Sequence, residues 1–138
     1  MVDSKRQTVD ERGEKMMTCR AIRGAITVEE NTVAAIKAAT RELLEHIIAI
    51  NGLEIADIAS VIFTATPDLD AAYPAVAARE MGWTHTPLLC MQEMAVQGSL
   101  PRCIRVLLHW NTDRVPADIR HVYLGEARAL RPDLAPGE

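Results

Sequence analysis

The residues best suited to chemistry lie close together in the segment CMQEM, at positions 90–94. A thiol at Cys90 and a carboxylate at Glu93 could serve as nucleophile and base, or they could only line a binding site. Positions three apart on a regular strand point to opposite faces, so the two side chains face one cavity only if the strand breaks. The pair Gly98-Ser99 that follows favours such a break. The role of Cys90 therefore depends on the charges around it.

Two arginines interrupt segments that otherwise have the apolar, β-branched composition of strands. Arg105 lies within CIRVLL, and Arg23 lies within RAIRGAITV, where it shares a strand face with two small alanines. Arginine is almost never fully buried without a partner, so an anion is expected near each. A structural ion pair with Glu93, or a solvated edge position, would explain Arg105 alone, and a solvated edge position would explain Arg23 alone. Together with Arg79 they favour a pocket for an anion, because guanidinium groups bind carboxylates through two parallel hydrogen bonds.

Other chemistries lack the residue patterns that they require. None of His46, His85, His109 and His121 stands beside a serine or cysteine in a catalytic motif. The glycines form no phosphate-binding or dinucleotide-binding pattern, and the three cysteines do not have the spacing of metal ligands. No zinc site is therefore predicted. Tyr123 is equally compatible with a core aromatic residue and with a ligand contact.

Composition excludes several classes of partner. The 138 residues carry a net charge of −4 and only 4% aromatic residues, which argues against nucleic-acid binding. No apolar run approaches the about 20 residues that cross a membrane, so no membrane partner is expected. The N-terminal segment has no apolar core of a signal peptide, and the odd cysteine count suits reduced thiols. We therefore predict a cytoplasmic protein.

The elements that must position these residues follow from the apolar periodicity. Residues 1–17 are polar and without periodicity, so we predict a disordered N-terminal extension. The sequence after residue 17 predicts one domain of the α+β or α/β class with one principal sheet, about five strands and two or three helices. The predicted strands span 20–28, 59–66, 86–90 and 102–111, with a last strand pair within 119–131; a long helix opens at Glu29–Asn31 and ends at Asn51-Gly52, a helical turn spans 54–58, and a short helix runs from Pro74 to Gly82.

Four long segments carry a family resemblance. IRGAITVEENT, TATPDLDAAYPAVAARE, CMQEMAVQGSLPRCIRVLL and IRHVYLGEARALRPDL closely resemble the monofunctional chorismate mutases of the Bacillus type, over about residues 19–134. The resemblance implies a domain at 18–134, a tail at 135–138, and a mixed five-stranded sheet packed by one long and one or two short helices. It also implies a homotrimer that forms a pseudo-α/β-barrel with active sites between subunits. The implied activity is conversion of chorismate to prephenate in aromatic amino-acid biosynthesis, without metal or cofactor.

The same resemblance assigns roles to individual residues. It implies that Arg105 faces the ether oxygen of the substrate and that Glu93 hydrogen-bonds the ring hydroxyl. Arg23 is expected to bind one substrate carboxylate and Tyr123 to contact the side-chain carboxylate, while Cys90 becomes a pocket thiol. The remaining expected pocket residues are the aromatic wall Tyr73, the accessory cations Arg79 and Arg131, and the lining residues Leu89, Met91, Gln92 and Leu130.

One residue departs from the family pattern, and one alternative function is compatible with the arginines. Val76 stands where the family pattern has a lysine, so one cation at the rim is missing and substrate affinity is expected to differ. The alternative function is a non-catalytic trimeric protein that binds a small carboxylate metabolite. Such a protein would keep the arginines but would tolerate loss of Glu93. The presence of Glu93 together with Arg105 favours the enzyme.

Overall fold

The computed structural model describes residues 11–13 and 17–133 of the chain. The predicted extension 1–17 lies largely outside the described residues, and the predicted tail 135–138 lies entirely outside them. In the described part, no helix has the length and apolar character needed to cross a membrane.

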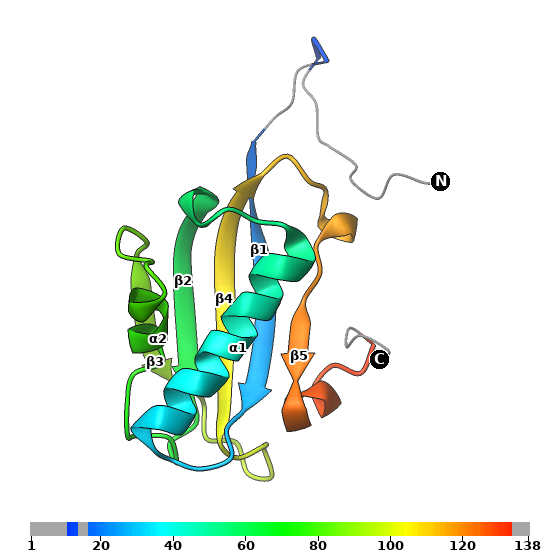
Figure 1. The fold of residues 1–138 in the computed structure, drawn as a ribbon. Coiled ribbons are helices and arrows are strands. Elements are labelled where there is room, and N and C mark those ends of the chain that lie inside the picture. Colours follow the sequence, from blue (N-terminus) through cyan, green and yellow to red (C-terminus); the bar gives the residue numbers. More distant parts are fainter. Residues whose placement is uncertain (1–10, 14–16, 134–138) are drawn as a thin grey trace.

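The centre of the fold is a mixed five-stranded sheet, as expected from the sequence (Figure 1). The central strand β4 pairs antiparallel with both β1 and β2, whereas the edge strands β3 and β5 run parallel to their neighbours. This arrangement surrounds Arg105, which lies on β4, with a strand on each side. The strands are β1 (Thr18–Thr27), β2 (Ile58–Ala65), β3 (Leu88–Gln92), β4 (Cys103–Thr112) and β5 (Val122–Leu124), in the order β3-β2-β4-β1-β5.

One long helix crosses one face of this sheet (Figure 1). Helix α1 (Val33–Asn51) begins after Thr32, whose hydroxyl accepts a hydrogen bond from the backbone N–H of Ala35 at 3.1 Å. The acidic residues expected to open the helix therefore precede it. Gly52 ends it, with its N–H bonded to the carbonyl of Ile48 at 2.8 Å. The shorter elements are α2 (Ala75–Glu80) and three 3₁₀ turns at Ile55–Asp57, Pro116–Asp118 and Gly125–Ala129.

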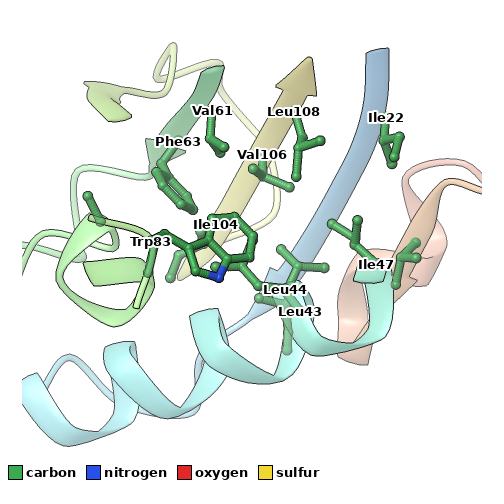
Figure 2. Packing of buried hydrophobic residues seen from close by; sticks show 14 of the residues in the cluster. Ile22, Leu43, Leu44, Ile47, Val61, Phe63, Trp83, Ile104, Val106 and Leu108 are labelled. Carbon is green, nitrogen blue, oxygen red and sulfur yellow. The ribbon is translucent and has the colours of Figure 1, made fainter. Parts of the chain in front are cut away.

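The main core lies between the helices and this sheet face. The buried stripe of α1 packs against alternate residues of β1, β2 and β4, and Trp83 closes the end near α2 (Figure 2). Gly24 permits the close approach, because a Cβ there would lie 3.0 Å from both Ile47 Cδ1 and Val106 Cγ1. The core residues shown include Ile22, Leu43, Leu44, Ile47, Val61, Phe63, Ile104, Val106 and Leu108.

The opposite sheet face carries the polar and charged positions. Alternation along β1 and β4 places Arg23 and Arg105 on this face, since their neighbours in each strand point into the core. Two large apolar residues of β3, Leu89 and Met91, are also exposed there, at 55% and 47%. Within the described residues, α1 and α2 both pack with the core on the other face. We call the face that carries Arg105 the open face, because it is uncovered around that residue; near β5, Ala127 and Leu130 pack against Ala25 and Tyr123 on it.

The predicted strands differ from those observed mainly at the C-terminal strand pair and at β3, and β1 begins two residues earlier than expected. The expected last strand pair is a single three-residue strand, β5, followed by a 3₁₀ turn. The chain turns at Gly125, and the N–H of Glu126 bonds to the hydroxyl of Thr27 instead of continuing a ladder. Strand β3 begins two residues later than expected, because Pro87 has no N–H to donate and only its carbonyl pairs with β2. It ends two residues later because the pairing with β2 continues through Met91 and Gln92.

Candidate active site

Arg105 stands near the middle of the open sheet face. Across the strand pairs, it lies opposite Thr64 of β2 on one side and Ala25 of β1 on the other. Its side chain is 44% exposed, and its Nε lies 3.5 Å from Oε1 of Glu93. The ion pair with Glu93, which was the structural alternative for Arg105, is therefore present, but it is long, and the guanidinium remains accessible to a ligand.

Glu93 follows directly after β3 and is held by β2. Its backbone N–H donates to the carbonyl of Ala65 at 2.9 Å, so the pairing of β3 with β2 continues one residue past the end of the strand. The carboxylate Oε1 accepts a hydrogen bond from the Thr64 hydroxyl at 2.5 Å. Glu93 thus shares the open face with Arg105 and Thr64.

Cys90 points to the other face of the sheet. It pairs with Phe63, a fully buried core residue, and packs against the main core. Because the alternation continues regularly through Glu93, the expected gathering of Cys90 and Glu93 around one cavity is wrong within one chain. Burial raises the pKa of the Cys90 thiol above its ordinary value of 9.0, and this outweighs the opposing effects of the Ala75 backbone and the Arg79 charge. The thiol is therefore protonated at neutral pH.

A cavity of about 430 Å³ lies at the β3 edge of the molecule. Tyr73, Cys90, Met91 and Gln92 line it together with the loop that precedes α2. Arg79 of α2 is close enough to Cys90 to affect its titration. We call Tyr73, Arg79 and Cys90 the edge group. Val76, also in α2, is half-buried and brings no charge to it.

Arg23 and Tyr123 lie where β1 meets β5. The backbone N–H of Arg23 donates to Nδ1 of His121 at 2.9 Å. Tyr123 stands opposite Ala25 and is buried in a small second cluster with Ala25, Cys103 and Ala127, against which Leu130 packs. This burial matches the core-aromatic alternative for Tyr123, and the ligand contact stays a prediction.

Arg131, near the C-terminal end, lies close enough to His121 to affect its titration. Arg131 forms a two-point ion pair with Asp133, at 3.1 and 2.9 Å. Burial, followed by the positive charges of Arg23 and Arg131, lowers the pKa of His121 from its ordinary value of 6.5. The neutral imidazole that results is the form whose Nδ1 can accept the Arg23 N–H.

The predicted site residues therefore form two groups in one chain. Arg105, Ala25 and Tyr123 follow one another across β4, β1 and β5, with Arg23 two positions from Ala25 on the same face. We call Arg23, Glu93, Arg105 and Tyr123 the sheet-face group. It combines cations with hydrogen-bonding oxygens, whereas the edge group lies at the β3 side of the molecule. In the described residues, no cluster of three or more histidine, cysteine or acidic side chains is suited to hold a metal.

Two supporting residues were not predicted from the sequence. Thr64 contacts Glu93, and Asn31 accepts hydrogen bonds from the N–H groups of Asp70 and Ala71 at 3.1 and 3.0 Å, which fixes the loop before Tyr73. For Thr64 the only sequence signal was its polar position in an alternating strand, and its partner depends on the strand register. For Asn31 the sequence carried no signal that pointed to a loop 39 residues away.

Comparisons with known proteins agree on one family. The sequence profile of chorismate mutase type I matches residues 19–134. Chorismate mutase AroH of Thermus thermophilus is 57% identical over 116 residues, which cover 83% of this chain and 95% of that protein. Chorismate mutase AroH of Bacillus subtilis is 50% identical over 121 residues, or 86% and 94% of the two chains.

A solved structure gives the same result in three dimensions. The chorismate mutase from Clostridium thermocellum superposes with a TM-score of 0.79 at 57% identity, and the match covers 80% of this chain and 98% of that one. The profile, the relatives and the mixed sheet with its open arginine face lead to a single conclusion: this chain belongs to the chorismate mutase type I family.

Proposed function

We propose that this protein is an isomerase that converts chorismate to prephenate in aromatic amino-acid biosynthesis. The observation that carries the proposal is Arg105, which stands on the open face of the sheet beside Glu93 at 3.5 Å with 44% of its side chain exposed. In a chain of this family, that arrangement offers a substrate one accessible cation and one carboxylate side by side.

The reaction needs neither a nucleophile nor a base. A carbon–oxygen bond breaks as a carbon–carbon bond forms within one dianionic molecule, and no proton is transferred. The protein must hold a compact diaxial conformer and stabilise the negative charge that develops on the ether oxygen. The raised pKa of Cys90 supports a lining role for its thiol, because a protonated thiol is a poor nucleophile.

The sheet-face group supplies groups for these tasks. In the proposed mechanism, Arg105 donates to the ether oxygen and Glu93 accepts from the ring hydroxyl. Arg23 binds one carboxylate, and Tyr123 contacts the side-chain carboxylate with support from Arg131. A millionfold acceleration corresponds to about 8 kcal/mol. One well-placed donor contributes about 3 to 4 kcal/mol, so positioning must contribute the rest.

The edge group is proposed to complete the site from a neighbouring copy. Cys90 faces the core side of the sheet whereas Arg105 faces the open side, so one chain does not bring the two groups together. The exposed Leu89 and Met91 give the open face an apolar surface suited to contact with another subunit. We therefore propose a cytoplasmic homotrimer in which three open faces form a barrel-like core and each site lies between two subunits.

The test is to incubate the purified protein with chorismate. Loss of the chorismate absorbance and appearance of prephenate are expected, without added metal or cofactor. Sedimentation equilibrium should give about three times the chain mass of 15.2 kDa. Folded protein that binds chorismate without turnover would instead indicate the non-catalytic metabolite-binding protein, and a monomer would contradict the shared site.

A further inference from the structure

The closest polar contact of Glu93 is a neutral hydroxyl. Oε1 of Glu93 accepts from the Thr64 hydroxyl at 2.5 Å, whereas Nε of Arg105 lies 3.5 Å from the same oxygen. The first distance is that of a strong hydrogen bond to a charged acceptor, and the second lies beyond the usual range for N–H to oxygen. The carboxylate is therefore oriented by Thr64 more than by Arg105.

The strand pairing makes this contact rigid. Thr64 stands opposite Arg105 in the β2–β4 pair, and the next residue, Ala65, accepts the backbone N–H of Glu93. Threonine is branched at Cβ and has few side-chain rotamers, so its hydroxyl is confined once the strand forms. Among the described residues, the Oε2 atom of Glu93 accepts no hydrogen bond.

The Thr64 hydroxyl affects how closely the Glu93 carboxylate and the Arg105 guanidinium can pair. A carboxylate and a guanidinium side by side tend to close into a two-point ion pair, which would use the donors of Arg105 and both oxygens of Glu93. The proton from Thr64 satisfies Oε1 without a charge and holds the carboxylate at the longer distance. Arg105 then keeps its donors for a ligand, and Glu93 keeps Oε2 for one.

We propose that Thr64 is a positioning residue for the rearrangement, which keeps Glu93 from closing on Arg105. The inference rests on the proposed function, because it assigns Glu93 and Arg105 their roles toward the substrate. Thr64 itself does not contact the reacting atoms. Its effect should therefore appear in kcat and depend on the charge of Glu93.

The experiment compares chorismate turnover by Thr64→Val with that of the parent protein. Valine keeps the shape and removes the donor, so kcat should fall about tenfold or more, with KM changed less than about threefold. Thr64→Ser, which restores a hydroxyl, should recover most of kcat. The matched control is Ser60→Ala on the same strand, which removes the hydroxyl that contacts His109 at 3.1 Å and should leave kcat unchanged within about twofold.

A double-mutant cycle with Glu93→Gln separates positioning from general damage. A neutral amide is not drawn into a salt bridge, so Thr64→Val should cost less than about twofold in the Glu93→Gln background. An equal loss in both backgrounds, or no rescue by serine, would overturn the inference. If Thr64→Val is misfolded by circular dichroism, Thr64→Ala takes its place in the same cycle.

The design also distinguishes this inference from the proposed function. If Glu93→Gln lowers kcat but Thr64→Val does not, only the role of Thr64 is wrong. If Glu93→Gln leaves kcat unchanged, the proposed role of Glu93 fails, and the role of Thr64 fails with it.

Discussion

At the residue scale, the open sheet face explains how a strand can carry an arginine between apolar neighbours. Ile104 and Val106 point into the main core and are almost fully buried, whereas Arg105 points away from it and remains 44% exposed. The charge therefore keeps much of its hydration and does not require a tight partner. A substrate that displaces this water would gain a strong, localised interaction.

Replacement of Arg105 tests that interaction directly. Arg105→Ala should lower kcat for chorismate at least about a hundredfold with a smaller change in KM, because the charge is needed most in the transition state. Steady-state kinetics measure the effect. Arg41→Ala is the control, since Arg41 is 57% exposed on α1 and forms an ion pair with Glu45 in the same helix. A higher KM with unchanged kcat would show that Arg105 binds the substrate but does not stabilise the charge of the transition state.

His121 links the sheet-face group to pH. Burial and the charges of Arg23 and Arg131 lower its pKa in the folded protein. Below its ordinary value of 6.5 the unfolded chain therefore binds a proton that the folded chain does not. The free energy of unfolding should fall as the pH falls through 6.5 toward the lower pKa of the folded state, and well above 6.5 this residue should contribute no pH dependence.

His121→Asn should reduce this dependence. The asparagine carbonyl oxygen can accept the N–H of Arg23 near the position of Nδ1, and it does not titrate. Urea unfolding of both proteins between about pH 7.5 and 5 measures the slope of stability against pH. The same slope in the variant and the parent protein would mean that other groups cause the dependence.

At the element scale, the turn after β5 determines where Tyr123 is held. Gly125 has a φ of 61°, and a Cβ there would lie 2.6 Å from the hydroxyl oxygen of Thr27. The same hydroxyl accepts the N–H of Glu126 at 3.0 Å. The turn therefore needs both a left-handed backbone and the space beside Thr27, which only glycine supplies.

Gly125→Ala should consequently destabilise the protein. We expect a loss of about 2 kcal/mol or more in the free energy of unfolding, from backbone strain together with the clash against Thr27. Gly82→Ala is the matched control, because its φ is also positive, at 94°, but no heavy atom beyond its two chain neighbours lies within 4 Å of the added Cβ. Urea denaturation of the three proteins measures the difference. Equal losses for the two variants would show that the contact with Thr27 is unimportant.

At the scale of the whole molecule, the two groups of predicted site residues lie on different parts of one chain. Tyr73 and Cys90 of the edge group line a cavity beside β3, whereas the sheet-face group extends from Glu93 across β4 and β1 to β5. A closed rotational assembly brings a different surface of each copy against its neighbour. A site shared between copies would then contain one group from each.

Subunit mixing tests this proposal. Arg105→Ala disables the sheet-face group, and Arg79→Glu places a negative charge in the edge group, so each variant alone should have little activity. After co-refolding of an equal mixture, about a quarter of the sites should combine two intact groups and recover that share of parental activity. Recovery that stays at the sum of the separate variants would contradict a shared site.

The periodicity of apolar and polar residues along the sequence determined much of the fold. Alternation placed Arg23 and Arg105 in strands with apolar neighbours, and helical periodicity ending at Asn51-Gly52 defined the long helix. These features were predictable because backbone geometry sets which neighbours along the chain share a face, and caps depend on residues a few positions apart.

Only the tertiary structure decided which distant residues meet. The register of β2 against β4 brought Thr64 opposite Arg105, and the pairing of β5 with β1 set Tyr123 beside Ala25. It also decided that β5 would be three residues long and that α1 and α2 would cover the same face. Strand order and register result from the burial of the whole core, and a slip of one residue would exchange the buried and exposed faces of a strand. Strand order and register therefore depend on residues throughout the chain, and no short segment determines them.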